Sequence, residues 1–196
     1  IAVYAQHKQI KEAMKVFEGM VQFNICLDDV TFLNAVSACA SCGDMLEGMK
    51  VHFLMVYTGM ESNQALDNAV LHMYSKCGNM IDAWNLFEKH YNHHDIISWN
   101  AMIAAYAHYG QLKDSFHLYR LMHEEDLVPD KVTFLSLIEG CTKQEALAEG
   151  IWMHNNILDK GFKLDIVTAT ALIEMYGRCG KLDIANDVFE SLQERD

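Results

Sequence analysis

The strongest constraint on the fold is that the chain repeats itself. Compared with itself at a shift of 102 residues, almost its whole length aligns. Val30–Leu33 matches Val132–Leu135, with VTFL in both, and Met73–Gly78 (MYSKCG) matches Met175–Gly180 (MYGRCG). Isolated residues between these blocks match as well, and the agreement is too extensive for chance. The chain is therefore expected to fold as an array of similar units.

Within each block the hydrophobic pattern predicts helical hairpins. In the stretch 96–130, one face of the first predicted helix carries Trp99, Met102, Ile103 and Tyr106, at i, i+3, i+4 and i+7. The second helix repeats the pattern with Leu112, Ser115, Phe116, Tyr119 and Met122. Neither helix can bury its apolar face alone, so neighbouring hairpins are expected to cover it.

Helix-boundary signals divide the chain into six hairpins. First helices are expected to start at the N-cap residues Thr31, Ser98, Thr133 and Thr168 and to end at Gly43, Gly78, Gly110 and Gly180. Lys8 and Glu145 replace that glycine in two units, so those turns are expected to be slightly strained or differently closed. The hairpins are 1–28 (truncated), 29–63, 64–95, 96–130, 131–165 and 166–196. This pattern predicts an all-α, right-handed α-solenoid of stacked helix-turn-helix repeats with a curved inner groove.

Composition narrows the function. With 51% hydrophobic residues and one proline, disorder is not expected, and the chain has no apolar run long enough for a membrane helix. The net charge of −12 argues against a generally basic nucleic-acid binder but leaves one local binding face possible. Six cysteines without a secreted-type framework favour a reducing compartment.

No catalytic or metal site is expected. Cys39 and Cys42 have CxxC spacing, but no second pair at zinc-ligand spacing follows. His123-Glu124-Glu125 fits the H-x-E of zinc deaminases by its letters alone, because the matching P-C-x-x-C is missing. We therefore expect no enzyme activity and no cofactor in this part of the protein.

The periodicity near 35 residues, with the segments VTF, MYSKCG, SWNAMI, MYGRCG and LVPD, resembles the pentatricopeptide repeat proteins. Hairpin lengths of 35, 35 and 31 or 32 residues resemble the plant PLS subclass, whose triplets contain P, L and S repeats. The six hairpins would then be P (truncated), L, S, P, L and S. The tetratricopeptide pattern W-x-x-L-G-x-x-Y is not seen.

The resemblance implies that each repeat reads one base of single-stranded RNA with a first-helix residue and the last residue of the repeat. The Asn68/Asp95 and Asn100/Asp130 pairs would read uridine, and the Thr170/Asp196 pair would read guanine. Leu33/Asn63 and Leu135/Asp165 would read poorly, and Asp28 lacks its partner. The implied RNA is 5′-x-x-U-U-x-G-3′. Without the resemblance, such Asn, Thr and Asp residues serve as helix caps.

Two further residue sets have two possible roles each. The aliphatic residues just before the Ser/Thr positions resemble the family's base-sandwiching residues, and they also suit a hydrophobic staple; they are Val30, Ile97, Val132 and Val167, with Ala65 as the exception. Lys76, Lys143 and Arg178 lie near first-helix ends, where they suit either RNA phosphates or the helix dipole.

The resemblance finally implies the targeting part of an organellar C-to-U RNA editing factor, with a mitochondrial or chloroplast address outside this chain. The L repeats would bind organellar editing cofactor proteins. The alternative is a tetratricopeptide-like scaffold that grips a peptide in the same groove. An acidic solenoid of this kind can also form an end-to-end homodimer.

Overall fold

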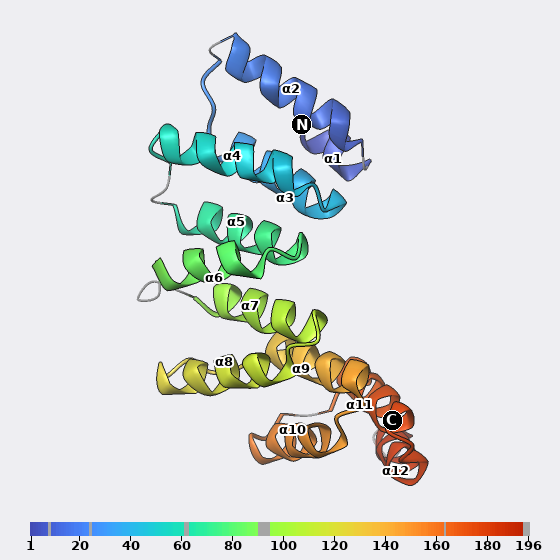
Figure 1. Cartoon of the computed structure of the whole chain (residues 1–196). Helices are drawn as coiled ribbons and strands as arrows, with labels where there is room; N and C mark the ends of the chain where they lie inside the picture. The colour runs from blue at the N-terminus through green and yellow to red at the C-terminus, as the bar shows by residue number, and fades with distance from the viewer. Residues whose placement is uncertain (8, 24, 61–62, 90–94, 163, 194–196) are drawn as a thin grey trace. The chain divides into compact units, whose positions relative to one another are not determined.

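The computed structural model describes residues 1–7, 9–23, 25–60, 63–89, 95–162 and 164–193, and its regular elements there are all helices (Figure 1). Each hairpin of the sequence contains two of them. Unit by unit, they are α1 (Ala2–Gln6) with α2 (Ile10–Gln22), α3 (Asp29–Cys42) with α4 (Met45–Tyr57), α5 (Gln64–Lys76) with α6 (Met80–Lys89), α7 (Ile96–His108) with α8 (Leu112–Glu124), α9 (Lys131–Gln144) with α10 (Leu147–Asp159), and α11 (Ile166–Arg178) with α12 (Leu182–Gln193). The predicted all-α class is confirmed.

The N-caps of the first helices lie three residues before the predicted Ser/Thr positions. Asp28, Asp130 and Asp165 are the N-cap residues, and each accepts a hydrogen bond from the backbone N–H of the Thr three residues later. Asp95 accepts from the N–H groups of Ile97 and Ser98 at 3.0 Å. The prediction of Thr31, Ser98, Thr133 and Thr168 as N-caps was therefore wrong. A carboxylate is the better acceptor for the exposed N–H groups of a first turn, and it places Ser or Thr inside the helix.

The predicted helix ends are confirmed. Gly43, Gly78, Gly110 and Gly180 all have φ between 69° and 79°, the left-handed conformation that closes a helix. Glu145 has φ 52° without the freedom of a glycine, as expected for a strained turn. Lys8 lies outside the described residues.

The chain divides into two compact units, 1–102 and 103–196, with the division inside α7. In the first unit, the first helices α1, α3 and α5 lie side by side, and α2 and α4 pack against α3. In the second unit, α9 contacts α8, α10 and α11, and α11 also packs on α12. The core of each unit lies between these layers and includes Phe32 and Phe87 in the first and Phe134 and Tyr176 in the second.

The contact between a second helix and the next first helix is built in the same way in both units. Gly48 of α4 faces Met73 of α5, and Gly150 of α10 faces Met175 of α11; a Cβ added to Gly150 would lie 2.5 Å from the Met175 sulfur. One turn further on, a histidine Nδ1 meets a tyrosine hydroxyl, at 2.9 Å for His52 and Tyr74 and at 3.0 Å for His154 and Tyr176. The 102-residue repeat of the sequence is thus a repeat of packing contacts.

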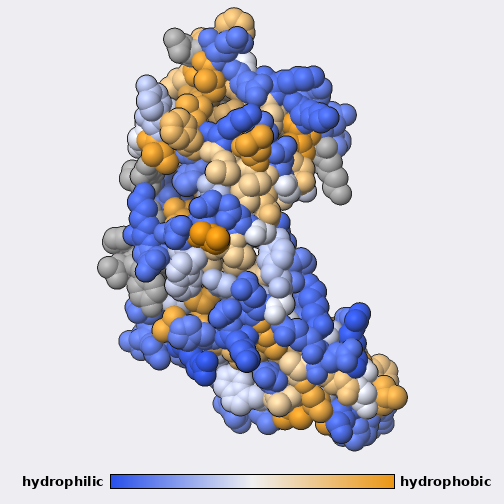
Figure 2. Space-filling model, in the orientation of Figure 1, coloured by the Kyte–Doolittle hydropathy of each residue, from blue (hydrophilic) through white to orange (hydrophobic). Residues whose placement is uncertain are grey.

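None of the described helices is both long and apolar enough to span a membrane. Apolar side chains still reach the surface in patches among hydrophilic ones (Figure 2). On α4 the exposed apolar side chains follow helical spacing, namely Leu46, Met49, Phe53, Val56 and Tyr57.

Candidate nucleic-acid interface

The predicted base-reading pair of the 64–95 repeat is assembled in the structure. Asn68 lies half-buried on α5, and its Nδ2 donates to both carboxylate oxygens of Asp95 at 3.2 Å. Ser98, on the first turn of α7, donates its hydroxyl hydrogen to Asn68 Oδ1 at 2.5 Å. The last residue of one repeat therefore does two things: it caps the next helix and holds the amide of its own repeat.

The last residues of the two predicted L repeats are engaged differently. Asn63 donates its Nδ2 to Asp29 Oδ2 at 2.6 Å and accepts from the Ala65 N–H at 2.9 Å. Asp165 forms an ion pair with Lys131. In both repeats, the last residue is thus tied to the first residue of the same repeat, and the Asn68 position holds the half-buried side chains of Leu33 and Leu135.

The pKa values of two capping carboxylates follow from these contacts. The Lys131 ammonium, together with the Thr168 N–H and hydroxyl, lowers the pKa of Asp165 to about 2. Hydrogen bonds from the Thr31 hydroxyl and backbone N–H lower the pKa of Asp28, whose Oδ1 is 2.5 Å from the Thr31 hydroxyl oxygen. Both groups are ionised at neutral pH, as a helix N-terminus favours.

The residues of the other two predicted base-reading pairs are considered one by one. Asn100 is buried in the first unit, whereas Asp130 caps α9 in the second unit through a capping box with Thr133. Thr170 is exposed on α11, and its hydroxyl donates to the Ile166 carbonyl at 2.6 Å. Asp196 lies outside the described residues.

The predicted base-sandwiching residues are exposed. Val30 and Ile97 are each 61% exposed, and Val132 and Val167 are each 53% exposed. All four occupy the second position of a first helix; Ala65 holds that position on α5. A hydrophobic staple uses the residue before the N-cap, and these four residues lie inside their helices, so the staple role does not apply to them.

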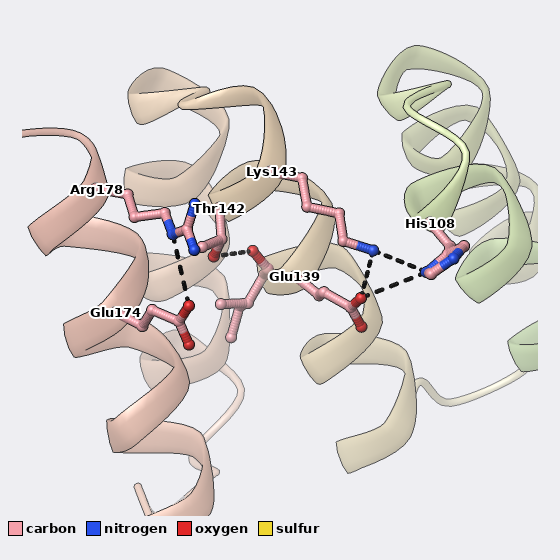
Figure 3. A network of polar contacts seen from close by, with 7 residues as sticks. His108, Glu139, Thr142, Lys143, Glu174 and Arg178 are labelled. Carbon is pink, nitrogen blue, oxygen red and sulfur yellow. Dashed lines mark hydrogen bonds and ion pairs between the residues drawn. The ribbon is translucent and has the colours of Figure 1, made fainter.

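Lys143 and Arg178 line a groove of about 440 Å³ between α9 and α11, together with Leu135 and Ala171. Figure 3 shows Lys143 beside Glu139 and His108, and Arg178 beside Glu174. Lys143 Nζ lies 2.7 Å from Glu139 Oε1 and donates to His108 Nδ1 at 2.7 Å. Arg178 Nε is 3.5 Å from Glu174 Oε1. The Lys143 hydrogen bond and charge, with a smaller part from His108, lower the pKa of Glu139.

These pairings change the expected electrostatics of the groove. Its two cations each have a carboxylate one turn earlier on the same helix, so the groove is close to neutral. Lys76, exposed at the end of α5, has His72 at the corresponding position. Glu139 and Glu174 were not predicted to lie beside these cations, although their i, i+4 spacing to Lys143 and Arg178 was the available signal.

Ser98 was expected as a cap and not as a partner of Asn68. The spacing Asp-x-x-Ser/Thr at the repeat junctions was the signal for its position beside the Asp carboxylate. Within the described part of the chain, no group of three or more His, Cys, Asp or Glu side chains could hold a metal ion. Cys39 is buried and Cys42 is exposed, and burial raises the pKa of the Cys39 thiol to about 12.

The helices are paired, and within each unit the first helix of one pair packs on the first helix of the next. Polar and aliphatic side chains recur at the N-termini of these first helices. The chain is therefore a helical-repeat protein of the α-solenoid class. Three family descriptions match the chain: "PPR repeat" over 1–25, 30–60 and 68–89, "PPR repeat family" over 94–143, and "Pentatricopeptide repeat domain" over 153–196. The chain belongs to the pentatricopeptide repeat family.

Two similar proteins of Arabidopsis thaliana illustrate the relationship. A pentatricopeptide repeat-containing protein named as chloroplastic is 31% identical over 195 residues, which is 100% of this chain and 24% of the relative. Another, named as mitochondrial, is 30% identical over 191 residues, 97% of this chain and 18% of the relative. The chain thus spans about a quarter or less of the length of these two relatives.

Solved structures of the family share the fold. The pentatricopeptide repeat protein PPR10 in complex with an 18-nucleotide psaJ RNA element aligns with a TM-score of 0.69 at 18% identity, covering 99% of this chain and 27% of PPR10. The PPR domain of A. thaliana protein-only RNase P 1, in complex with tRNA, aligns with a TM-score of 0.64 at 9% identity, covering 89% of this chain and 94% of that domain. At these identities the likeness concerns the fold.

Proposed function

We propose that the chain binds single-stranded RNA sequence-specifically, one repeat to one base. The observation that carries this proposal is the joined Asn68 and Asp95 side chains, held between two consecutive first helices. Two repeat-family structures of the same fold are complexes with RNA, which supports the ligand class.

The chemistry of the pair suits uridine. Nδ2 of Asn68 has a second hydrogen, and the carboxylate of Asp95 retains lone pairs beyond those that its donors occupy. A donor beside an acceptor complements the O4 and N3–H groups of uracil. Thr170 suits guanine, because its hydrogen is donated to Ile166 and its oxygen lone pairs can accept from guanine N–H groups.

The proposed repeat order is P, L, S, P, L, S with the boundaries given above, and the proposed target is 5′-x-x-U-U-x-G-3′. The two L repeats would contribute little base discrimination, since leucine takes the place of the amide and the last residue is bound to the first residue of its repeat. Val30, Ile97, Val132 and Val167 would flank the bases, and Lys76, Lys143 and Arg178 would contact phosphates.

We further propose that the full protein is a PLS-type organellar C-to-U editing factor. Relatives named as chloroplastic and mitochondrial support the organelle. A cytidine deaminase would act from outside this chain. Cofactor proteins would dock on the L repeats, where α4 exposes Phe53 (70%) and Tyr57 (79%) and α10 exposes Trp152 (46%).

The experiment measures the affinity of the chain for single-stranded RNA containing U-U-x-G, and for versions with each U changed to G, over a range of salt concentrations. The variants are Asn68→Thr and Asn100→Thr, with Asn155→Thr on the exposed face of α10 as the control. We expect each first-helix variant to shift preference from U towards G at its own position, and all binding to weaken with salt. The control should behave as the wild type.

Equal affinity for every RNA in every variant would overturn base reading. Peptide binding without RNA binding would favour the tetratricopeptide-like scaffold. An end-to-end homodimer is a separate proposal, supported by exposed Val3 on α1 and Leu182 on α12. It predicts a sedimentation coefficient that rises with protein concentration, and a constant value at all concentrations would refute it.

A further inference from the structure

The Ser98 hydroxyl is buried at the centre of the Asn68/Asp95 pair. Its oxygen lies 2.5 Å from Asn68 Oδ1 and 3.2 Å from Asp95 Oδ1. A hydroxyl has a single hydrogen to donate, and the shorter distance assigns it to the asparagine. Ser98 therefore acts on the orientation of the Asn68 side chain.

Only one of the two amide orientations of Asn68 satisfies both neighbours. An ionised carboxylate only accepts hydrogen bonds, so the amide nitrogen must face Asp95. The oxygen then faces Ser98, which donates to it. Rotating the amide by 180° would oppose an oxygen to the carboxylate and lose both bonds to Asp95, and the Ser98 hydroxyl would have to turn to accept from the amide nitrogen.

Amide orientation matters because uracil and cytosine present opposite patterns. Uracil has an N3–H donor beside an O4 acceptor, whereas cytosine has an N3 acceptor beside an N4–H₂ donor. We propose that Ser98 is a positioning residue that sets the preference for uridine over cytidine of the 64–95 repeat, although it belongs to the next repeat. This inference rests on the proposed RNA-binding function.

The chain contains a matched control at the equivalent place on α11. Thr168 is also buried, three residues after a capping aspartate, and its N–H donates to Asp165 Oδ1 at 2.9 Å. The residue at the Asn68 position of the preceding repeat, 131–165, is Leu135, which has no amide to orient. Removing the Thr168 hydroxyl therefore perturbs a helix start without touching a base-reading amide.

The test uses two RNAs that differ only in U or C opposite the 64–95 repeat. Affinities for both are measured with the wild type, Ser98→Ala, Ser98→Thr, Ser98→Cys and Thr168→Ala, and folding is checked by circular dichroism. Loss of one neutral hydrogen bond should lower the U-over-C ratio about fivefold in Ser98→Ala. Ser98→Thr should keep the ratio, and Ser98→Cys, a weak donor of similar size, should give an intermediate ratio. Thr168→Ala should lower thermal stability and keep the wild-type ratio.

The outcomes separate this inference from the proposed function. A wild-type chain that does not distinguish U from C at this position would overturn base reading and the inference together. A wild type that prefers U, with the same ratio in folded Ser98→Ala or Ser98→Cys, would overturn the role of Ser98 alone. A ratio lowered equally in Thr168→Ala would show a general effect of helix capping and would also overturn it.

Discussion

Two glycines, Gly48 and Gly150, determine how closely the second helix of one repeat approaches the first helix of the next. Replacing Gly150 by Ala places a methyl group against the buried Met175 side chain. The thioether is flexible, so part of the overlap can be relieved, and we expect a loss of about 1–2 kcal/mol in the free energy of unfolding. Urea unfolding of Gly150→Ala and Gly48→Ala measures it.

Gly177→Ala is the control for that measurement. Gly177 lies on α11, the same helix as Met175, and a Cβ added to it meets nothing within 4 Å. Alanine has the higher helix propensity, so this variant should gain up to about 1 kcal/mol. Equal stabilisation by Gly150→Ala would contradict the packing argument.

His154 makes stability depend on pH. Burial lowers its pKa below the ordinary value, and the neutral ring can accept the Tyr176 hydroxyl hydrogen through Nδ1. The unfolded chain takes up a proton near pH 6.5 more readily than the folded chain, so stability is full above that pH and falls as pH decreases through it. Unfolding at pH 7.5 and 5.5 should show this loss, and His154→Gln should reduce the difference. An unchanged difference would remove His154 from the explanation.

Among the turns that join the two helices of a repeat, the turn between α9 and α10 has glutamate where four of its counterparts have glycine. Glu145 adopts φ 52°, a conformation that its counterparts Gly43 and Gly180 adopt at φ 69° and 71°. Glu145→Gly should therefore stabilise the chain by about 0.5–1 kcal/mol, measured by thermal or urea unfolding. The reverse change, Gly180→Ala, should destabilise by a similar amount. If both variants lowered stability, strain at Glu145 would not be the cause.

The helices themselves could be predicted because several local signals agree. Apolar spacing, left-handed glycines and the internal repeat all indicate the same hairpins. The starts were misplaced because Asp-x-x-Ser/Thr presents two residues that can cap a helix, and the prediction took the second of them. Lys143 contacts both Glu139 on its own helix and His108 on α7. The i, i+4 spacing could predict the first contact, whereas the second depends on how the two helices pack.

For the whole molecule, the net charge of −12 opposes RNA binding, and the carboxylates beside the two groove cations add to this locally. The double variant Glu139→Gln/Glu174→Gln releases Lys143 and Arg178 for phosphate contacts. We expect its RNA affinity to rise several-fold at low salt, with a steeper salt dependence because more counterions are released. Titrations at several salt concentrations measure both quantities.

A change of the same charge elsewhere provides the control. Glu124→Gln/Glu190→Gln alters α8 and α12, away from the first-helix groove, and should raise affinity less. Equal gains in the two double variants would mean that total charge matters and that the groove pairing does not. The comparison of the two double variants therefore separates the local effect of Glu139 and Glu174 from the effect of net charge.

The repeated Gly–Met and His–Tyr contacts also have a genetic consequence. An in-frame deletion of residues 64–165 joins α4 directly to α11, and Gly48 and His52 then meet Met175 and Tyr176, the residue types that they meet in the intact chain. Unequal recombination between the two blocks would therefore yield shorter or longer arrays with unchanged junctions. The shortened gene product should unfold cooperatively by circular dichroism, whereas a deletion ending half a repeat away should not. A gene of this kind can therefore gain or lose whole triplets of repeats while the helix contacts at the junction stay the same.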